Sequence, residues 1–260
     1  MMNGLRLFVA LFTCLLMQPA QAGRFTVTAG NSEILFDEAA GVPVRWVICA
    51  PDCADAEANR AVLMDQGDGF VRVTTPEGPA GVFAASVTES ADEVSVEFVA
   101  QNERYVYRLS RFSPEIGVEL PANARLAIAS GQVFVPEQLP GFSQMYSRVH
   151  AVQVSADGQS IYEFEAKDGG EGEIAIALPA NDTNWTGVRN RYWTLLTQPS
   201  GGPMTAKVEF TGQDRPVVEL APESGADRVG IRLYSGPVEW RPLQQVAPEL
   251  CNIRLPALLA

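Results

Sequence analysis

The chain has 260 residues, 47% of them hydrophobic, and a formal net charge of −12 at pH 7. Its length suits one large domain or two small ones. The acidic surplus excludes the basic surface with which proteins neutralise phosphate, so we expect no nucleic-acid partner, and the acidity itself favours solubility.

Residues 1–22 have the three-part layout of a secretory signal peptide. Arg6 precedes an apolar run from Leu7 to Met17, and small residues follow up to Ala22. This run is shorter than the roughly 20 residues that a membrane span needs, which favours cleavage after Ala22 over an uncleaved anchor. Lipidation of Cys14 is a weaker alternative. We therefore expect an exported domain at 23–260.

The cysteines fit an exported protein. After loss of the signal, Cys49, Cys53 and Cys251 remain. The Cys49-Ala-Pro-Asp-Cys53 spacing fits a small disulfide loop at a turn, with free thiols as the alternative. A metal site needs more ligands than this pair, and the single histidine, His150, is distant in sequence. We expect a Cys49–Cys53 disulfide, no metal and no cofactor.

From residue 23 onward, short segments alternate apolar and polar residues and are separated by turn residues. In the segment 93–99, for example, Val94, Val96 and Phe98 alternate with polar neighbours, which is typical of antiparallel sheets with one buried face. The expected strands are 25–29, 32–36, 42–48, 69–74, 82–88, 93–99, 104–110, 116–120, 124–128, 160–164, 173–177, 184–198, 204–210, 216–220 and 228–234.

Two segments differ from this pattern. Ala54–Arg60 is rich in Ala and Glu and predicts a short helical turn, while Leu243–Leu250 predicts a short C-terminal helix that Pro248 limits. The region from 131 to about 160 predicts a long connection. So many strands without a linker predict an all-β fold, a large antiparallel two-sheet sandwich.

The segment Asn184–Gln198 is the densest in aromatic and basic residues, and its alternation predicts one long strand with one buried face. Arg189 and Arg191 lie two apart, so their side chains point to one face. They are the candidate contacts to a partner, with a cross-strand ion pair as the alternative. The aromatic side chains fit the core of a sandwich.

Catalytic residues are not expected. A Ser-His-Asp triad would have to use His150, and no Gly-x-Ser-x-Gly elbow occurs. Carboxylate pairs such as Glu93 and Glu97, or Glu163 and Glu165, fall on outward strand faces or in loops, where solvated carboxylates are usual. The sequence therefore predicts a protein that is not an enzyme.

Three short motifs resemble the periplasmic domain of the YidC membrane insertase family. They are Trp185–Trp193, Ile231–Pro237 and Val246–Leu250, with looser agreement over Phe25–Ile48 and Arg104–Leu120. The resemblance implies a periplasmic β-supersandwich with the shape of galactose-mutarotase domains. The family's membrane helices begin beyond the point matching Leu250, so the resemblance does not imply insertase activity. It does not imply mutarotase chemistry either, since that needs a histidine and glutamate pair.

Two functions follow as expectations. The favoured one is a non-catalytic accessory module that contacts an envelope protein, such as an insertase or translocase component, or a translocating chain. Inner-membrane association would then come through the partner or an uncleaved N-terminus. The alternative is a carbohydrate-binding or carbohydrate-active sandwich protein in which Trp185, Tyr192 and Trp193 stack on sugars.

Overall fold

The computed structural model describes residues 23–63, 70–76, 83–100, 103–129, 149–155, 158–162, 174–190, 193–211, 215–223 and 228–237. Their regular structure is all strand, as the alternating sequence predicts. In chain order the strands are β1 (Arg24–Ala29), β2 (Ser32–Asp37), β3 (Val42–Ala50), β4 (Asn59–Leu63), β5 (Val71–Thr74), β6 (Ala84–Glu89), β7 (Glu93–Ala100), β8 (Glu103–Ser110), β9 (Glu115–Pro121), β10 (Arg125–Ala129), β11 (His150–Ser155), β12 (Gly158–Tyr162), β13 (Ile174–Ala180), β14 (Asn184–Arg189), β15 (Trp193–Pro199), β16 (Met204–Thr211), β17 (Arg215–Pro222) and β18 (Arg228–Pro237). These ranges hold no helix suited to crossing a membrane.

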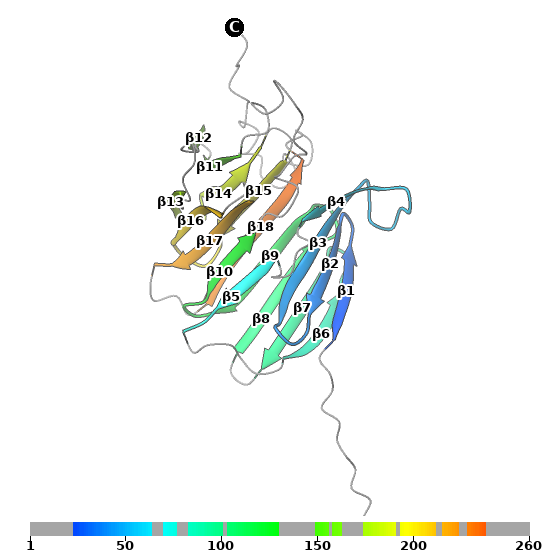
Figure 1. Cartoon of the computed structure of the whole chain (residues 1–260). Coiled ribbons are helices and arrows are strands. Elements are labelled where there is room, and N and C mark those ends of the chain that lie inside the picture. The colour runs from blue at the N-terminus through cyan, green and yellow to red at the C-terminus, as the bar shows by residue number, and fades with distance from the viewer. Residues whose placement is uncertain are drawn as a thin grey trace, which may run out of the picture.

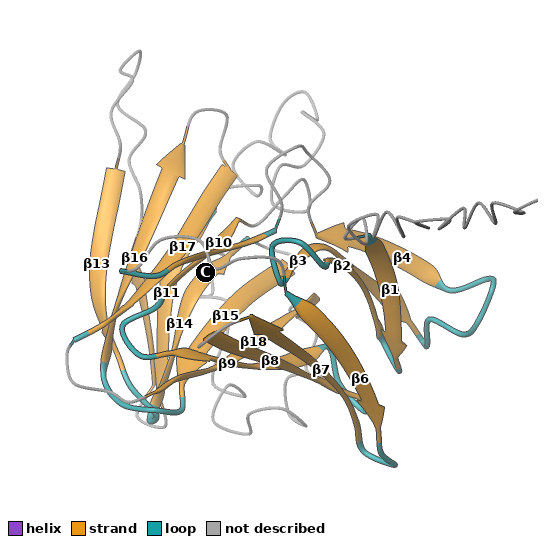
Figure 2. Cartoon of the chain, turned by 90° about the horizontal axis from the view of Figure 1, so that it is seen from below, coloured by secondary structure: helices purple, strands orange, loops and turns teal. Residues whose placement is uncertain are grey.

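The strands form three antiparallel sheets (Figure 1). The largest has nine strands in the order β12-β11-β14-β15-β18-β9-β8-β7-β6. A four-stranded sheet, β1-β2-β3-β4, and a five-stranded sheet, β13-β16-β17-β10-β5, complete the set. Figure 2 shows the four-stranded sheet over the β6–β8 part of the largest sheet, while β14 contacts β13, β16 and β17 of the five-stranded sheet. The two smaller sheets together form the second layer of a β-sandwich.

One apolar core fills the space between the layers, because alternate residues of each strand point inward. Aromatic rings join the layers at one end: the Phe36 ring on β2 lies 5.6 Å from the Phe98 ring on β7 and 5.4 Å from the Tyr107 ring on β8. At the other end, Val188 and Leu195 of the largest sheet belong to the same core as β16 and β17. Residues of all three sheets contribute to this core, which joins them into one sandwich.

The helical turn predicted at Ala54–Arg60 is wrong. The backbone forms turns as far as Ala58 and then enters β4, which pairs with β3. The carboxylates of Asp52 and Asp55 accept hydrogen bonds from the amides of Ala54 (2.7 Å) and Glu57 (2.9 Å). Such local bonds compete with helical ones, and they outweigh the helix propensity of a few Ala and Glu residues.

The single strand predicted over Asn184–Gln198 is also wrong, because the segment is the hairpin β14–β15 with Arg189 opposite Thr194. Asn190 closes the turn: its amide donates to the Trp193 carbonyl (2.9 Å), and its side-chain oxygen accepts from the Trp193 amide (2.7 Å). Every residue of β14 is buried, so the strand has no exposed face.

The structure also bears on the long connection expected in the middle of the chain. Part of the connection predicted between 131 and about 160 is strand: β11 lies between β12 and β14. The signal peptide expected at 1–22 and the helix expected at Leu243–Leu250 lie outside the described residues.

Candidate functional site

A cavity of about 440 Å³ opens where β9 leaves the largest sheet and the chain turns into β10. Its walls come from the end of β5, the start of β8, the end of β9, the β9–β10 turn and the start of β18. The lining residues are Thr75, Pro76, Glu103, Arg104, Glu119, Leu120, Pro121, Ala122, Asn123 and Arg228. Polar and charged groups therefore converge on a space of the size that holds a small ligand.

Glu119 lies at the centre of an ionic cluster on the outer face of the largest sheet. Arg108 Nη1 donates to its Oε1 at 2.5 Å, and Arg228 Nη1 lies 4.0 Å from its Oε2. The hydrogen bond from Arg108 lowers the pKa of Glu119 below its usual value. Glu119 is therefore a carboxylate at neutral pH and presents acceptor oxygens.

Glu103 and Arg104, the first two residues of β8, contact different partners. Arg104 forms a close ion pair with Glu97 on the neighbouring strand β7. That hydrogen bond lowers the pKa of Glu97, so both groups stay charged. Glu103 Oε2 accepts a hydrogen bond of 2.7 Å from the Tyr105 hydroxyl, whose pKa is raised by burial and by this bond. The cavity walls are thus fixed by side-chain contacts that exist without a ligand.

Asn123 lines the cavity at the β9–β10 turn. Its φ is +61°, in the left-handed region that asparagine tolerates better than most residues, and its side chain is exposed. The Ala124 amide donates to the Pro121 carbonyl across this turn (3.3 Å). The Asn123 amide can therefore offer both a donor and an acceptor to a ligand.

These lining groups suit a polyhydroxylated ligand better than an apolar one. Carboxylates, guanidinium groups and an amide are planar, and each can make paired hydrogen bonds to adjacent hydroxyl groups. The described lining residues include no aromatic ring, and the apolar contribution comes from Leu120 and from Pro76 and Pro121. A ligand would be held chiefly by hydrogen bonds.

Arg189, one of the two candidate partner contacts, is not a lining residue of this cavity. Arg189 is only 4% exposed, at the end of β14, and burial lowers the pKa of its guanidinium. It therefore offers little surface to a partner in the folded chain. Arg191 falls outside the described residues, as does Tyr192, so a contact role for Arg191 stays a prediction.

The two described tryptophans of the same hairpin serve packing. Trp185 is fully buried, with the Arg232 guanidinium carbon 4.9 Å from its ring centroid. Trp193 packs partly buried against the core, and its Nε1 donates to Ser235 Oγ at 2.8 Å. A fully buried ring cannot stack on a sugar, so the sugar contact expected of Trp185 is wrong.

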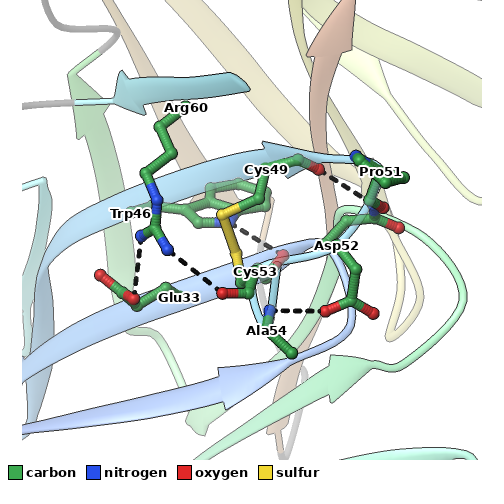
Figure 3. The surroundings of a disulfide bond; sticks show 10 residues. Glu33, Trp46, Cys49, Pro51, Asp52, Cys53, Ala54 and Arg60 are labelled. Carbon is green, nitrogen blue, oxygen red and sulfur yellow. Dashed lines mark hydrogen bonds and ion pairs between the residues drawn. A yellow bond between two sulfur atoms is a disulfide. The ribbon is translucent and has the colours of Figure 1, made fainter. Parts of the chain in front are cut away.

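Cys49 and Cys53 form the disulfide that their spacing predicts (Figure 3). The Arg60 guanidinium braces the loop, because Nη2 donates to the Cys53 carbonyl (3.1 Å) while Nη1 pairs with Glu33 (3.2 Å). Both cysteines are buried, and the loop lies on the four-stranded sheet. It is a structural feature away from the cavity.

In the described parts of the chain, His150 and the paired carboxylates do not form a second site. His150 begins β11 opposite Arg189 and is not a lining residue of the cavity. Within the described ranges, no group of three or more His, Cys, Asp or Glu side chains could hold a metal ion. Glu93 and Glu97 lie on the outer face of β7, where Arg108 and Arg104 pair with them.

The cavity residues had no signature in the sequence, because four separate segments supply them. The one local signal was the Pro121-Ala-Asn123 turn between two strands, since asparagine at a tight turn often takes a positive φ. Nothing in that signal connects the turn to Arg228, more than a hundred residues later.

No family model matches the chain, and no curated protein matches it. Solved structures do. A galactose mutarotase related enzyme from Lactobacillus acidophilus superposes with a TM-score of 0.52 at 8% identity, over 82% of this chain and 97% of that chain. The Slr1438 protein from Synechocystis sp. PCC 6803 gives 0.48 at 7% identity, over 88% and 99% of the two chains.

An alpha-N-acetylgalactosaminidase from Bifidobacterium bifidum gives a TM-score of 0.47 at 11% identity, and the match spans 82% of this chain but only 36% of that enzyme. At such identities a likeness establishes the fold alone. The chain has the β-sandwich architecture of galactose-mutarotase-like domains.

Proposed function

We propose that this chain is an exported, non-catalytic carbohydrate-binding module whose site is the cavity around Glu103, Glu119, Asn123 and Arg228. The observation that carries the proposal is the convergence of these planar polar groups on a space of about 440 Å³. The galactose-mutarotase-like fold supports it, because the similar Lactobacillus structure is described as a galactose mutarotase related enzyme. The disulfide supports an exported location, where such bonds persist.

Two features of the cavity support a binding role over a catalytic one. Glycoside hydrolysis needs one carboxylic acid with a raised pKa, so that it can protonate the leaving group. The hydrogen bond from Arg108 instead lowers the pKa of Glu119. Mutarotation needs a histidine and glutamate pair, and His150 does not line the cavity. A carboxylate that remains ionised, as Glu119 does, suits recognition of hydroxyl groups.

Calorimetric titration of the purified chain with a panel of monosaccharides and short oligosaccharides tests the proposal. We expect Glu103→Gln and Asn123→Gly each to weaken saccharide binding by about 10-fold, roughly the free energy of one hydrogen bond to a charged group. Glycine accepts the φ of Asn123, so this variant removes the amide and leaves the turn. Glu89→Gln is the control, because Glu89 is an exposed ion-paired glutamate away from the cavity lining. Failure of every saccharide to bind would contradict the proposal.

A second candidate is the accessory role that the resemblance to the YidC periplasmic domain implies. The observation favouring it is that two of the resembling motifs, distant in sequence, meet in space: β15 pairs with β18, and Trp193 donates to Ser235. A tagged full-length chain should then retain an insertase or translocase component from envelope extracts. Recovery of neither component, together with no protection of an unfolded substrate against aggregation, would count against this role.

A further inference from the structure

Arg228 is the charged group of the cavity with the weakest internal contact. Its side chain is 65% exposed at the start of β18, and its ion pair with Glu119 spans 4.0 Å, beyond hydrogen-bond range. A long, exposed pair of this kind contributes little stability. Its guanidinium keeps its donors available, as far as the described residues are concerned.

The other charged lining groups are engaged more closely. Arg104 is held by Glu97, Glu119 accepts from Arg108 at 2.5 Å, and Glu103 accepts from Tyr105 at 2.7 Å. A ligand group that displaces one of these partners gives up the existing contact. Arg228 can take a ligand group at almost no such cost.

Arg228 also lies on a different strand from Arg104, the other arginine of the cavity lining. Arg228 pairs in register with Pro121 on β9, and continuing the β8–β9 register places Arg104 on the other side of the same residue. Strands are spaced by about 4.8 Å, so the two backbones lie roughly 10 Å apart. Arg104 is also held by Glu97, so a small anionic group beside Arg228 meets one planar fork of donors that has no closer partner among the described residues, a geometry that matches a carboxylate.

We infer that Arg228 makes the cavity selective for saccharides that carry a carboxylate, as uronic acids do, with the hydroxyl groups bound by Glu103, Glu119 and Asn123. This inference rests on the proposed carbohydrate-binding function and names its ligand class. The carboxylate of the sugar takes the free side of the guanidinium, and Glu119 remains neutralised by Arg108.

The net charge of −12 does not oppose this assignment. At physiological ionic strength the Debye length is about 8 Å, so distant surface charges are largely screened from a bound anion. Glu119 lies inside that distance, 4.0 Å from Arg228, and its charge is offset by the hydrogen bond from Arg108. A directly hydrogen-bonded guanidinium acts inside that distance. Overall repulsion slows the approach of an acidic saccharide more than it weakens the bound state.

Isothermal titration of the full chain with galacturonate, glucuronate, galactose, glucose and acetate tests the inference. We expect the uronates to bind at least about 10-fold more tightly than the neutral sugars, equivalent to about 1.4 kcal/mol. Arg228→Gln should remove the preference, so that the uronates bind no more tightly than the neutral sugars do to the same variant. Arg228→Lys, which keeps the charge without the fork, should lie between.

Arg125→Gln is a matched control. Arg125 is 63% exposed and lies 4.0 Å from Glu219, much as Arg228 lies from Glu119, but it does not line the cavity. It should leave all affinities unchanged. Circular dichroism checks that each variant is folded.

The outcomes separate the two proposals. Equal affinity for uronates and neutral sugars overturns the carboxylate selectivity and leaves carbohydrate binding in place. No binding of any sugar overturns both. Acetate binding as tight as galacturonate, lost in Arg228→Gln, also overturns the inference, because it shows an anion site that does not recognise the sugar.

Discussion

The guanidinium of Arg232 lies over the buried ring of Trp185, with its carbon 4.9 Å from the ring centroid. Its Nε donates to Glu115 at 2.7 Å and its Nη1 to Gln198 at 2.8 Å. One side chain on β18 thereby joins β9, β14 and β15, so it fixes the relative position of four strands of the largest sheet.

Replacing this arginine should weaken the sheet. We expect Arg232→Met, which keeps about the aliphatic part of the side chain and removes the guanidinium, to lower the free energy of unfolding by about 1.5–3 kcal/mol, because hydrogen bonds to a charged group are lost. Urea unfolding followed by circular dichroism measures the change. Arg125→Met, which removes only an exposed pair, should change stability by less than about 1 kcal/mol. Equal losses in the two variants would contradict the bracing role of Arg232.

Gly30 is required by a close backbone approach. Its φ is +50°, and a Cβ at this position would overlap the carbonyl oxygen of Arg111, which is backbone and cannot rotate away. We expect Gly30→Ala to destabilise the fold by roughly 1–3 kcal/mol through overpacking. Gly41→Ala is the comparison, because φ there is also left-handed, at +64°, but the nearest atoms, at 3.0 Å, belong to the Phe83 side chain and not to the backbone. Its loss should be smaller, and a Gly30→Ala loss no larger than this would argue against the backbone overlap.

The disulfide should stabilise the four-stranded sheet. The double variant Cys49→Ser and Cys53→Ser should lose about 2 kcal/mol, since a five-residue loop constrains the unfolded chain only moderately. Thermal unfolding with and without a reductant measures the loss. Reductant should lower the Tm of the wild type but leave that of the double variant unchanged. An equal reductant effect on both proteins would show that the Cys49–Cys53 bond is not the stabilising element.

Stability should fall in acid through Glu97 and Glu119. Hydrogen bonds from Arg104 and Arg108 lower the pKa of these carboxylates below their usual value of 4.5. A lowered folded-state pKa contributes stability above about 4.5, and the contribution is lost as pH falls through the lower folded values. Urea midpoints measured between about pH 2 and 7 should therefore drop in the acid limb.

The variant Glu97→Gln and Glu119→Gln tests this assignment. It should show a shallower acid limb than the wild type, since neither glutamine titrates. An unchanged slope would assign the acid sensitivity to other carboxylates. Both groups are partly exposed, so the expected effect is a change of slope and not a loss of folding.

The sequence by itself determined the fold class, because the period-two alternation of residues is local to each strand. Val94, Val96 and Phe98 are buried as their spacing predicts, and β7 has one apolar and one polar face. The Cys49–Cys53 disulfide could also be predicted from the sequence, because a separation of four residues fits a bridge across a turn. These features depend only on near neighbours in the chain.

Tertiary structure alone decided which strands are covered on both faces and which distant residues meet. β14 carries polar residues and glycine yet is buried throughout, because burial depends on what packs over a strand and not on its own pattern. The break at Asn190 depends on the pairing of β14 with β15, and it contains neither glycine nor proline to announce it. The cavity joins Asn123 to Arg228 only because β9 and β18 pair, and such a long-range contact leaves no local trace in the sequence.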